Sequence, residues 1–223
     1  MNLSYTDEQN LLRDSVSKFC GSDYDFETRM KSVNSENGHN PEHWKLFAEL
    51  GWLAIPFSED LGGLDGGDVD LSLMFEEFGK SIVVEPYLAN VVLSGSVLKR
   101  SDLENRTDLI EQLIAGEKQV SLANYEPKKG FNLDNVECEI SDDGKVSGLK
   151  TTVLNAPNAD LFLVFGKHKS GFAFALISKG AEGSKVTTYK TYDGFVSGDL
   201  LLENCKAEAV FSKSDALEIL HQA

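Results

Sequence analysis

The spacing of apolar residues changes near Gly116 of this 223-residue chain, and the change limits the possible folds more than any other feature. Before Gly116 the apolar residues recur every three or four positions, which is the period of an amphipathic helix. After it they alternate with polar residues or form short continuous runs, as strands do. The sequence therefore predicts an α+β multidomain protein, with an all-α helical domain over residues 1–116 and a small β-domain over residues 117–211.

Helix-start signals divide the first domain into five predicted helices. Each signal pairs a residue that caps the first turn, or a proline that opens it, with apolar residues at helical spacing. The predicted starts are the capping pair Thr6 and Gln9, Asn40-Pro41, Asp70, Pro86 and a point near Thr107. Between the second and third helices, the segment SEDLGGLDGGD predicts a loop, because its glycines lack the spacing of a phosphate-binding motif.

Turn residues and short apolar runs divide the second domain into six or seven predicted strands. A period of two at Val136, Cys138 and Ile140 predicts the first strand, and Asp142-Asp143-Gly144 predicts a hairpin turn after it. Later strands are expected at residues 145–149, 161–165, 172–177, 186–189 and 199–202. Two of these runs are almost wholly apolar, which places them at the centre of a small antiparallel β-barrel or sandwich.

The last residues predict the beginning of a third domain. Ser212 and Asp215 form a helix-start pattern, and apolar residues at helical spacing follow. No glycine, asparagine or proline ends this helix before Ala223. We therefore expect residues 212–223 to be the start of a truncated helical domain.

Charge and hydropathy restrict the partners and the location of the protein. The chain has 21 basic and 36 acidic residues and a formal net charge of −15, so nucleic acid is not an expected partner. An anionic ligand such as a CoA thioester or a flavin dinucleotide would need local donors. No segment approaches the ~18 apolar residues of a membrane span. The amino terminus has no cationic leader, which predicts a cytoplasmic protein.

Neither a disulfide framework nor a metal site is expected. The three cysteines, Cys20, Cys138 and Cys205, are scattered and lack CxxC spacing. His39 and His43 are four residues apart, but a helix begins between them, so they would not share one helix face. No pattern of Ser, His and Asp indicates a hydrolase.

Four segments, in the same order along the chain, resemble the acyl-CoA dehydrogenase family. YTDEQNLLRDSVSKF resembles the family's opening helix, and HWKLFAELGWLAIPFSEDLGGL resembles its second helix and the loop that follows. EEFGKSIVVEPYLANVVLSGSVL and TYDGFVSGDLLLENC are most similar to the small subunit of two-component members. The resemblance implies the family's N-terminal helical and middle β-domains, without its C-terminal four-helix domain.

The same resemblance implies a FAD-dependent oxidoreductase acting on an acyl-CoA thioester. In the family, a carboxylate removes the proton alpha to the thioester carbonyl while the beta carbon transfers a hydride to flavin N5. That carboxylate belongs to the C-terminal domain. No catalytic residue is therefore expected in this chain, and the chain alone is expected to be inactive.

Two family signatures give the candidate cofactor contacts. The turn that contacts the isoalloxazine ring corresponds to Ala123, Asn124 and Tyr125, and Tyr125 replaces a threonine. A tryptophan and a threonine beside the flavin correspond to Thr152 and Leu154. Because the stacking ring and a hydroxyl donor are lost, we expect FAD to bind weakly or not at all. An alternative is that turn and strand keep the family geometry without a ligand.

Lys128, Lys129 and Phe131 are the candidate substrate contacts. The two lysines could contact a phosphate of CoA or of the flavin, or they could form a solvated loop, as most surface lysines do.

The sequence leaves three alternatives for the role of the chain in an assembly. The chain could be an enzyme subunit, a non-catalytic partner that completes a flavin site in another acyl-CoA dehydrogenase subunit, or a separate interaction protein. Because family members associate chiefly through the C-terminal domain, we expect exposed apolar surface on the β-domain and a homo- or hetero-oligomer.

Overall fold

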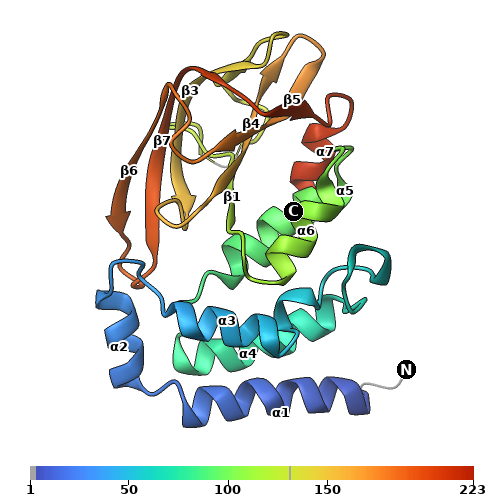
Figure 1. Cartoon of the computed structure of the whole chain (residues 1–223), viewed down its shortest axis with the longest axis vertical. Coiled ribbons are helices and arrows are strands. Elements are labelled where there is room, and N and C mark those ends of the chain that lie inside the picture. The colour runs from blue at the N-terminus through green and yellow to red at the C-terminus, as the bar shows by residue number, and fades with distance from the viewer. Residues whose placement is uncertain (1–3, 131) are drawn as a thin grey trace.

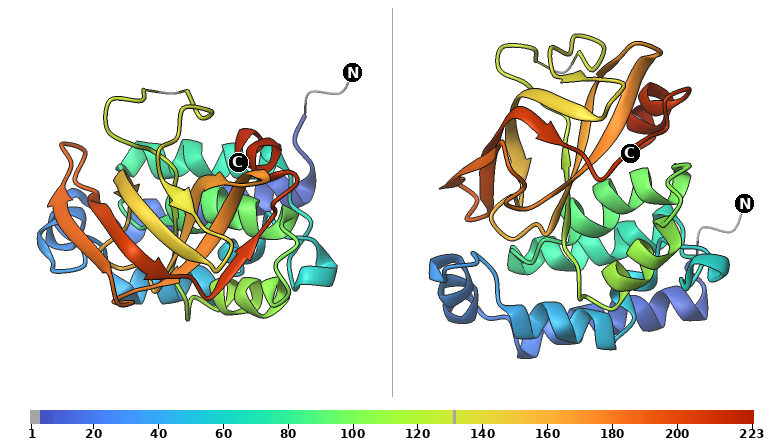
Figure 2. Two further views of the ribbon diagram at one scale, coloured as in Figure 1. Left: turned by 90° about the horizontal axis from the view of Figure 1, so that it is seen from above. Right: turned by 45° about the horizontal axis from the view of Figure 1, so that its top comes forward.

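The protein consists of a helical layer and a curved sheet that lies over it (Figure 1). The computed structural model describes residues 4–130 and 132–223. Seen from above, the strands extend across the helices, and the loop after β1 projects to one side of the sheet (Figure 2). The α+β class and the order of helices before strands are confirmed.

The helical layer contains α-helices, two short 3-10 turns and one π-helix. The α-helices are α1 (Asp7–Ser22), α2 (Phe26–Asn34), α3 (Pro41–Glu49), α4 (Asp68–Ser81), α5 (Gly95–Arg100) and α6 (Arg106–Ile114). The 3-10 turns are η1 (Trp52–Ala54) and η2 (Glu59–Leu61), and the π-helix is η3 (Leu88–Ser94).

Buried aromatic rings form the centre of this layer. The Phe47 ring stacks on Phe78 with centroids 5.5 Å apart, and it also contacts Trp52 at 4.8 Å and Phe19 at 5.2 Å. These residues come from α1, α3, η1 and α4. The helical periodicity therefore places one ring of each element in a single core.

The predicted helix starts are confirmed at two positions and corrected at one. Thr6 and Gln9 form the predicted capping box, and Pro41 occupies the first turn of α3. Asp70 is not the cap of α4, because the helix already begins at Asp68. The Asp70 carboxylate instead accepts a hydrogen bond from the Gly67 amide at 2.9 Å, as an acid in a first helical turn can do.

Helix α2 was not predicted, because it has no apolar stripe. Its buried residues are Arg29 and Ser32, while Phe26 is 72% exposed. Arg29 donates from Nη2 to the Asp193 carbonyl at 2.6 Å and from Nε to the Ile82 carbonyl at 2.8 Å. The helix is therefore held by hydrogen bonds to a distant hairpin, which periodicity does not reveal.

The β-domain has eight strands among the described residues. They are β1 (Val120–Ala123), β2 (Glu139–Ile140), β3 (Lys145–Leu154), β4 (Leu161–His168), β5 (Gly171–Ser178), β6 (Ser184–Lys190), β7 (Val196–Lys206) and β8 (Ala209–Phe211). Their order is β6-β7-β3-β2-β4-β5-β8, and β1 pairs with β4 off this path. Most pairs are antiparallel as predicted, but β1 and β2 pair parallel with β4.

The π-helix η3 joins the helical layer to the sheet. Ser94 Oγ donates to the Ala89 carbonyl at 2.7 Å and lies 2.8 Å from the Val120 carbonyl. The Asn90 side-chain oxygen accepts from the Val120 amide at 2.5 Å. Strand β1 is therefore fixed to η3 by side chains that are fully buried.

The predicted last helix is present as α7 (Ala216–His221) and lies beside α5 and β5 (Figure 1). Arg100 Nε donates to the side-chain oxygen of Gln222 at 3.1 Å, which links the end of α5 to the end of the chain. Over residues 4–130 and 132–223, every helix is too short or too polar to cross a bilayer.

Candidate functional site

A buried ion pair joins the turn after β1 to strand β3. Lys150 Nζ lies 2.7 Å from Glu126 Oε1, and the two side chains are 0% and 4% exposed. Glu126 also accepts hydrogen bonds from the backbone amides of Glu137 and Cys138, at 2.6 and 2.9 Å. Lys150 Nζ is also 3.4 Å from the Asn124 carbonyl. The pair is thus surrounded by backbone groups that satisfy both charges, as a buried ion pair requires.

This ion pair brings the two predicted cofactor segments together. The Thr151 amide donates to the Tyr125 carbonyl at 2.9 Å, so the turn lies directly against β3. Tyr125 is 39% exposed, whereas Ala123 is fully buried in β1 and presents only its backbone. The residues expected from the family signatures therefore adjoin in space, although they are about thirty positions apart in the sequence.

A β-bulge in β3 sets the direction of Thr152 and Leu154. The pairing register with β7 shifts between Lys150 and Val153, and Thr152 has φ +53°. Positive φ is unusual for a β-branched residue, and bulges often redirect side chains near functional sites. The Thr152 side chain is exposed, while its amide donates to Asp199 Oδ1 at 3.2 Å.

An apolar cavity of about 190 Å³ lies between the helical layer and the β-domain. Leu154 forms part of its wall, so one predicted cofactor contact faces it. The other lining residues are Gly38, His39, Val84, Pro86, Leu88, Ala89, Asn155, Asp193, Phe195 and Val196. We call this space the apolar cavity. Its volume is below the ~300 Å³ of a typical drug-sized pocket, so it fits a small apolar group.

The few polar groups of the apolar cavity are engaged elsewhere or uncharged. Burial lowers the pKa of His39, although the Asn37 carbonyl and Glu85 oppose the shift, so the imidazole is neutral at pH 7. The Asp193 carboxylate accepts from the Phe195 amide at 3.1 Å and from the Thr191 hydroxyl. The Asp193 carboxylate is thus already hydrogen-bonded, and His39 is a neutral imidazole.

Sequence reasoning missed the buried carboxyl group of Glu85. Its Oε1 lies 3.2 Å from His43 Nδ1, and its Oε2 has no partner among the described residues. The side chain is fully buried between α3 and the segment before η3, while its neighbours Val84 and Pro86 line the apolar cavity. In the sequence, Glu85 stands out only by its position, five residues after Lys80 and directly before Pro86.

Two of the predicted substrate contacts, Lys128 and Lys129, do not line the apolar cavity. Lys128 and Lys129 lie in the loop after β1, and Lys129 Nζ is 2.5 Å from Glu137 Oε1. Lys128 is exposed with φ +62°. Phe131 lies outside the described residues.

The outer side of the sheet does expose apolar side chains, since the paired residues Leu149 and Leu201 are 38% and 37% exposed.

The described residues contain no group of three His, Cys, Asp or Glu side chains placed to hold a metal. Cys20, Cys138 and Cys205 are all free and buried. Burial raises the pKa of the Cys138 thiol to about 11, with Glu126 and Glu139 adding to the shift and Lys150 opposing it. These thiols are therefore protonated at neutral pH and unreactive.

The ion pair gives stability that depends on pH. Burial alone would raise the pKa of Glu126, but the Lys150 hydrogen bond and charge and the amides of Cys138 and Glu137 lower it below 4.5 overall. The stabilisation from the ionised Glu126 is therefore complete above the pKa of about 4.3 that glutamate has in the unfolded chain. It is lost as pH falls through the lower pKa of Glu126 in the folded protein. Urea unfolding from pH 7 to 3 should show this loss. In the Glu126→Gln variant, the free energy of unfolding should lack this part of its fall with pH. An equal fall in both proteins would contradict the assignment.

A helical layer, an eight-stranded sheet and an apolar cavity between them define an α+β scaffold with a candidate ligand site. The family description "Acyl-CoA dehydrogenase, N-terminal domain" matches residues 6–117, and the chain belongs to this family.

Solved structures of similar fold include two-chain assemblies. The chain matches the ChsE4-ChsE5 complex from Mycobacterium tuberculosis with a TM-score of 0.85 and 24% identity, over 98% of this chain and 61% of that one. It matches a variant of the Tcur3481-Tcur3483 steroid ACAD with a TM-score of 0.86 and 20% identity, over 96% and 60% of the two chains.

A curated relative, isovaleryl-CoA dehydrogenase of Pongo abelii, is 27% identical over 92% of this chain and 52% of its own length. Acryloyl-CoA reductase (NADH) of Anaerotignum propionicum is 22% identical over 94% of this chain and 56% of its own length. The chain thus spans little more than half the length of these relatives.

Proposed function

We propose that this chain is part of a FAD-dependent acyl-CoA dehydrogenase and that it does not turn over substrate alone. The observation that carries the proposal is the ion pair Lys150–Glu126, which holds the turn at Asn124 and Tyr125 against the β3 bulge, beside an apolar cavity. A small apolar space near exposed backbone groups suits a ligand that carries an apolar group, such as an acyl chain.

The residues at this surface fit a flavin through backbone groups and one exposed hydroxyl. The turn at Asn124 and Tyr125 would hold the ring edge, Thr152 would offer its exposed side chain, and Leu154 would form an apolar wall. When bound, FAD would accept the hydride that leaves the beta carbon of the acyl group. Lys150 is unavailable for this purpose, because its ammonium is buried against Glu126.

The expected inactivity of the isolated chain follows from its carboxyl groups. Asp193 is the carboxylate lining the apolar cavity among the described residues, and it is held by Phe195 and Thr191. Glu85 faces His43. Removal of the proton alpha to a thioester needs a base within hydrogen-bond reach of it, and we propose that this base is supplied from outside the described residues.

The test measures flavin binding and turnover separately. The purified chain is incubated with FAD, desalted and examined for visible flavin absorbance, and then assayed by dye reduction with short, long and steroid acyl-CoA thioesters. We expect no steady turnover by the chain alone, and turnover when it is co-expressed with a larger acyl-CoA dehydrogenase subunit. Steady turnover by the isolated chain would refute the proposal.

A second candidate function is that of a partner subunit without catalysis. Two observations favour it: position 152 has no stacking aromatic ring, and position 154 has no hydroxyl. The solved ChsE4-ChsE5 complex has a similar fold. In this case the co-purified complex would contain flavin, but variants at Thr152 and Leu154 would leave its flavin content unchanged.

Replacement of Leu154 by threonine should strengthen FAD binding if the first candidate is correct. A hydroxyl at this wall adds one hydrogen bond, worth about 0.5–1.5 kcal/mol, which corresponds to roughly a 2- to 10-fold lower dissociation constant. Fluorescence titration of FAD measures the change. Leu201→Thr, at an exposed leucine of β7, is the matched control and should have no effect.

A further inference from the structure

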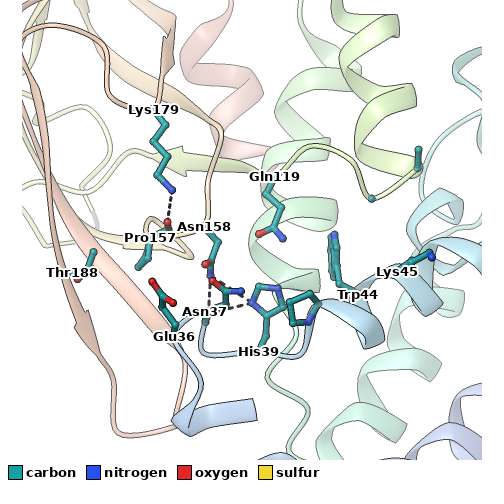
Figure 3. Close-up of a pocket in the computed structure, with 13 residues that line it drawn as sticks. Glu36, Asn37, His39, Trp44, Lys45, Gln119, Pro157, Asn158, Lys179 and Thr188 are labelled. Carbon is teal, nitrogen blue, oxygen red and sulfur yellow. Dashed lines mark hydrogen bonds between the residues drawn. The ribbon is translucent and has the colours of Figure 1, made fainter. Parts of the chain in front are cut away.

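A second cleft, of about 570 Å³, lies between the helical layer and the β-domain and shares His39 with the apolar cavity. Its polar lining includes Glu36, Asn37, Trp44, Lys45, Gln119 and Lys179 (Figure 3). We call this space the polar cleft. Among the predicted cofactor and substrate residues that the structure describes, none lines it, so the proposed flavin site does not account for it.

Trp44 contributes a buried donor without a partner to the polar cleft. The residue is 3% exposed, and its Nε1–H has no hydrogen-bond partner among the described residues. Tryptophan N–H groups usually find an acceptor when they are buried. A Cβ atom at Gly116 would lie 3.6 Å from this nitrogen, so a side chain at position 116 would pack against the indole.

Hydrogen bonds fix the amides around this donor. Gln119 Oε1 accepts from Asn155 Nδ2 at 2.7 Å, which leaves the Gln119 amide nitrogen as a donor. Asn158 Nδ2 donates to the Asn37 carbonyl at 2.8 Å and to Asn155 Oδ1 at 2.7 Å. Figure 3 shows Gln119 and Trp44 on the same side of the polar cleft. Two donors from different domains are thus held in place before any ligand arrives.

The charges of the lining favour an anion. Lys45 and Lys179 carry positive charge and Glu36 carries negative charge, so the lining has a net charge of +1 on a chain of −15. His39 adds no charge at pH 7, because burial lowers its pKa. Lys179 Nζ donates to the Pro157 carbonyl at 2.7 Å, and Lys45 Nζ is 3.8 Å from Glu49, so each ammonium keeps further donors.

We propose that the polar cleft binds a small carboxylate. Its oxygens would accept from the Trp44 indole and the Gln119 amide, and its charge would be balanced by Lys45 and Lys179. Glu36 lines the cleft and opposes a dianion, so a singly charged carboxylate fits better than a phosphate dianion.

The indole proton of Trp44 reports directly on this binding. The ¹⁵N-labelled chain has two indole cross-peaks, from Trp44 and Trp52, which the Trp44→Phe variant assigns. Sodium acetate is titrated at constant ionic strength against sodium chloride, with inorganic phosphate in a parallel titration. We expect a saturable downfield shift of the Trp44 peak with acetate, while the Trp52 peak, outside the cleft, stays in place.

Exposed lysines provide variants that should keep the fold. Lys45→Met and Lys179→Met should each raise the acetate dissociation constant about 2- to 5-fold, whereas Lys31→Met, at an exposed lysine of α2, should not change it. An immobile Trp44 peak, a shift that never saturates or an equal shift with chloride would overturn the proposal. Saturation at lower concentration with phosphate than with acetate would overturn the choice of carboxylate. These outcomes do not depend on flavin binding.

Discussion

The Lys150→Met variant is expected to lose about 3–5 kcal/mol of unfolding free energy, because it leaves the Glu126 carboxylate buried without its partner. Glu126 would keep the Glu137 and Cys138 amides but lose the 2.7 Å contact with the ammonium. The turn at Tyr125 should loosen from β3 as well. Urea unfolding followed by circular dichroism measures the change.

Two further variants separate the buried charge from side-chain packing. In the double variant Lys150→Met with Glu126→Gln, no buried charge is left, so part of the stability should return. Lys145→Met, at an exposed lysine of the same strand, should change stability by no more than about 0.5 kcal/mol. A loss below about 1 kcal/mol in Lys150→Met would show that the pair does not hold the turn.

Truncation of Phe47 to alanine should cost about 3–5 kcal/mol, the usual range for a fully buried phenylalanine. The ring is 0% exposed and contacts rings from α1, η1 and α4. Its loss would leave a cavity at the point where these elements meet. Thermal unfolding should show a clearly lower midpoint, with the β-domain affected only through the shared core.

Phe26→Ala is the matched control, because Phe26 is 72% exposed on α2. This variant should change stability by about 0.5 kcal/mol or less. If the two phenylalanine variants lost similar stability, the aromatic cluster would not be the centre of the helical core.

Local patterns were enough to predict the helical layer where caps and apolar stripes coincide. The Thr6 capping box and the proline at position 41 gave correct helix starts. The cap predicted at Asp70 lies three residues after the observed cap, Gly67, because an acid in the first turn can resemble the cap itself. Helix α2 was missed, since its buried residues are polar and its partners lie more than fifty positions away.

Two segments of the candidate site were selected from the sequence. Family signatures located the turn at Tyr125 and the strand at Thr152, and the structure places these two segments side by side. The ion pair between Glu126 and Lys150 could not be predicted, because it joins residues 24 positions apart through the folded sheet. Leu154 faces a cavity whose other wall belongs to the helical layer, and the sequence contains no local sign of that wall.

The contacts of Val120 with Asn90 and Ser94 affect how the protein would respond to proteolysis and to unfolding. The hydrogen bond from the Val120 amide to Asn90 and the close contact with Ser94 connect the first strand to the layer that precedes it, four residues after Gly116. A protease cut between the two domains would therefore yield fragments that remain associated. In hydrogen exchange, the Val120 amide should be released only when both domains open, as one cooperative unit.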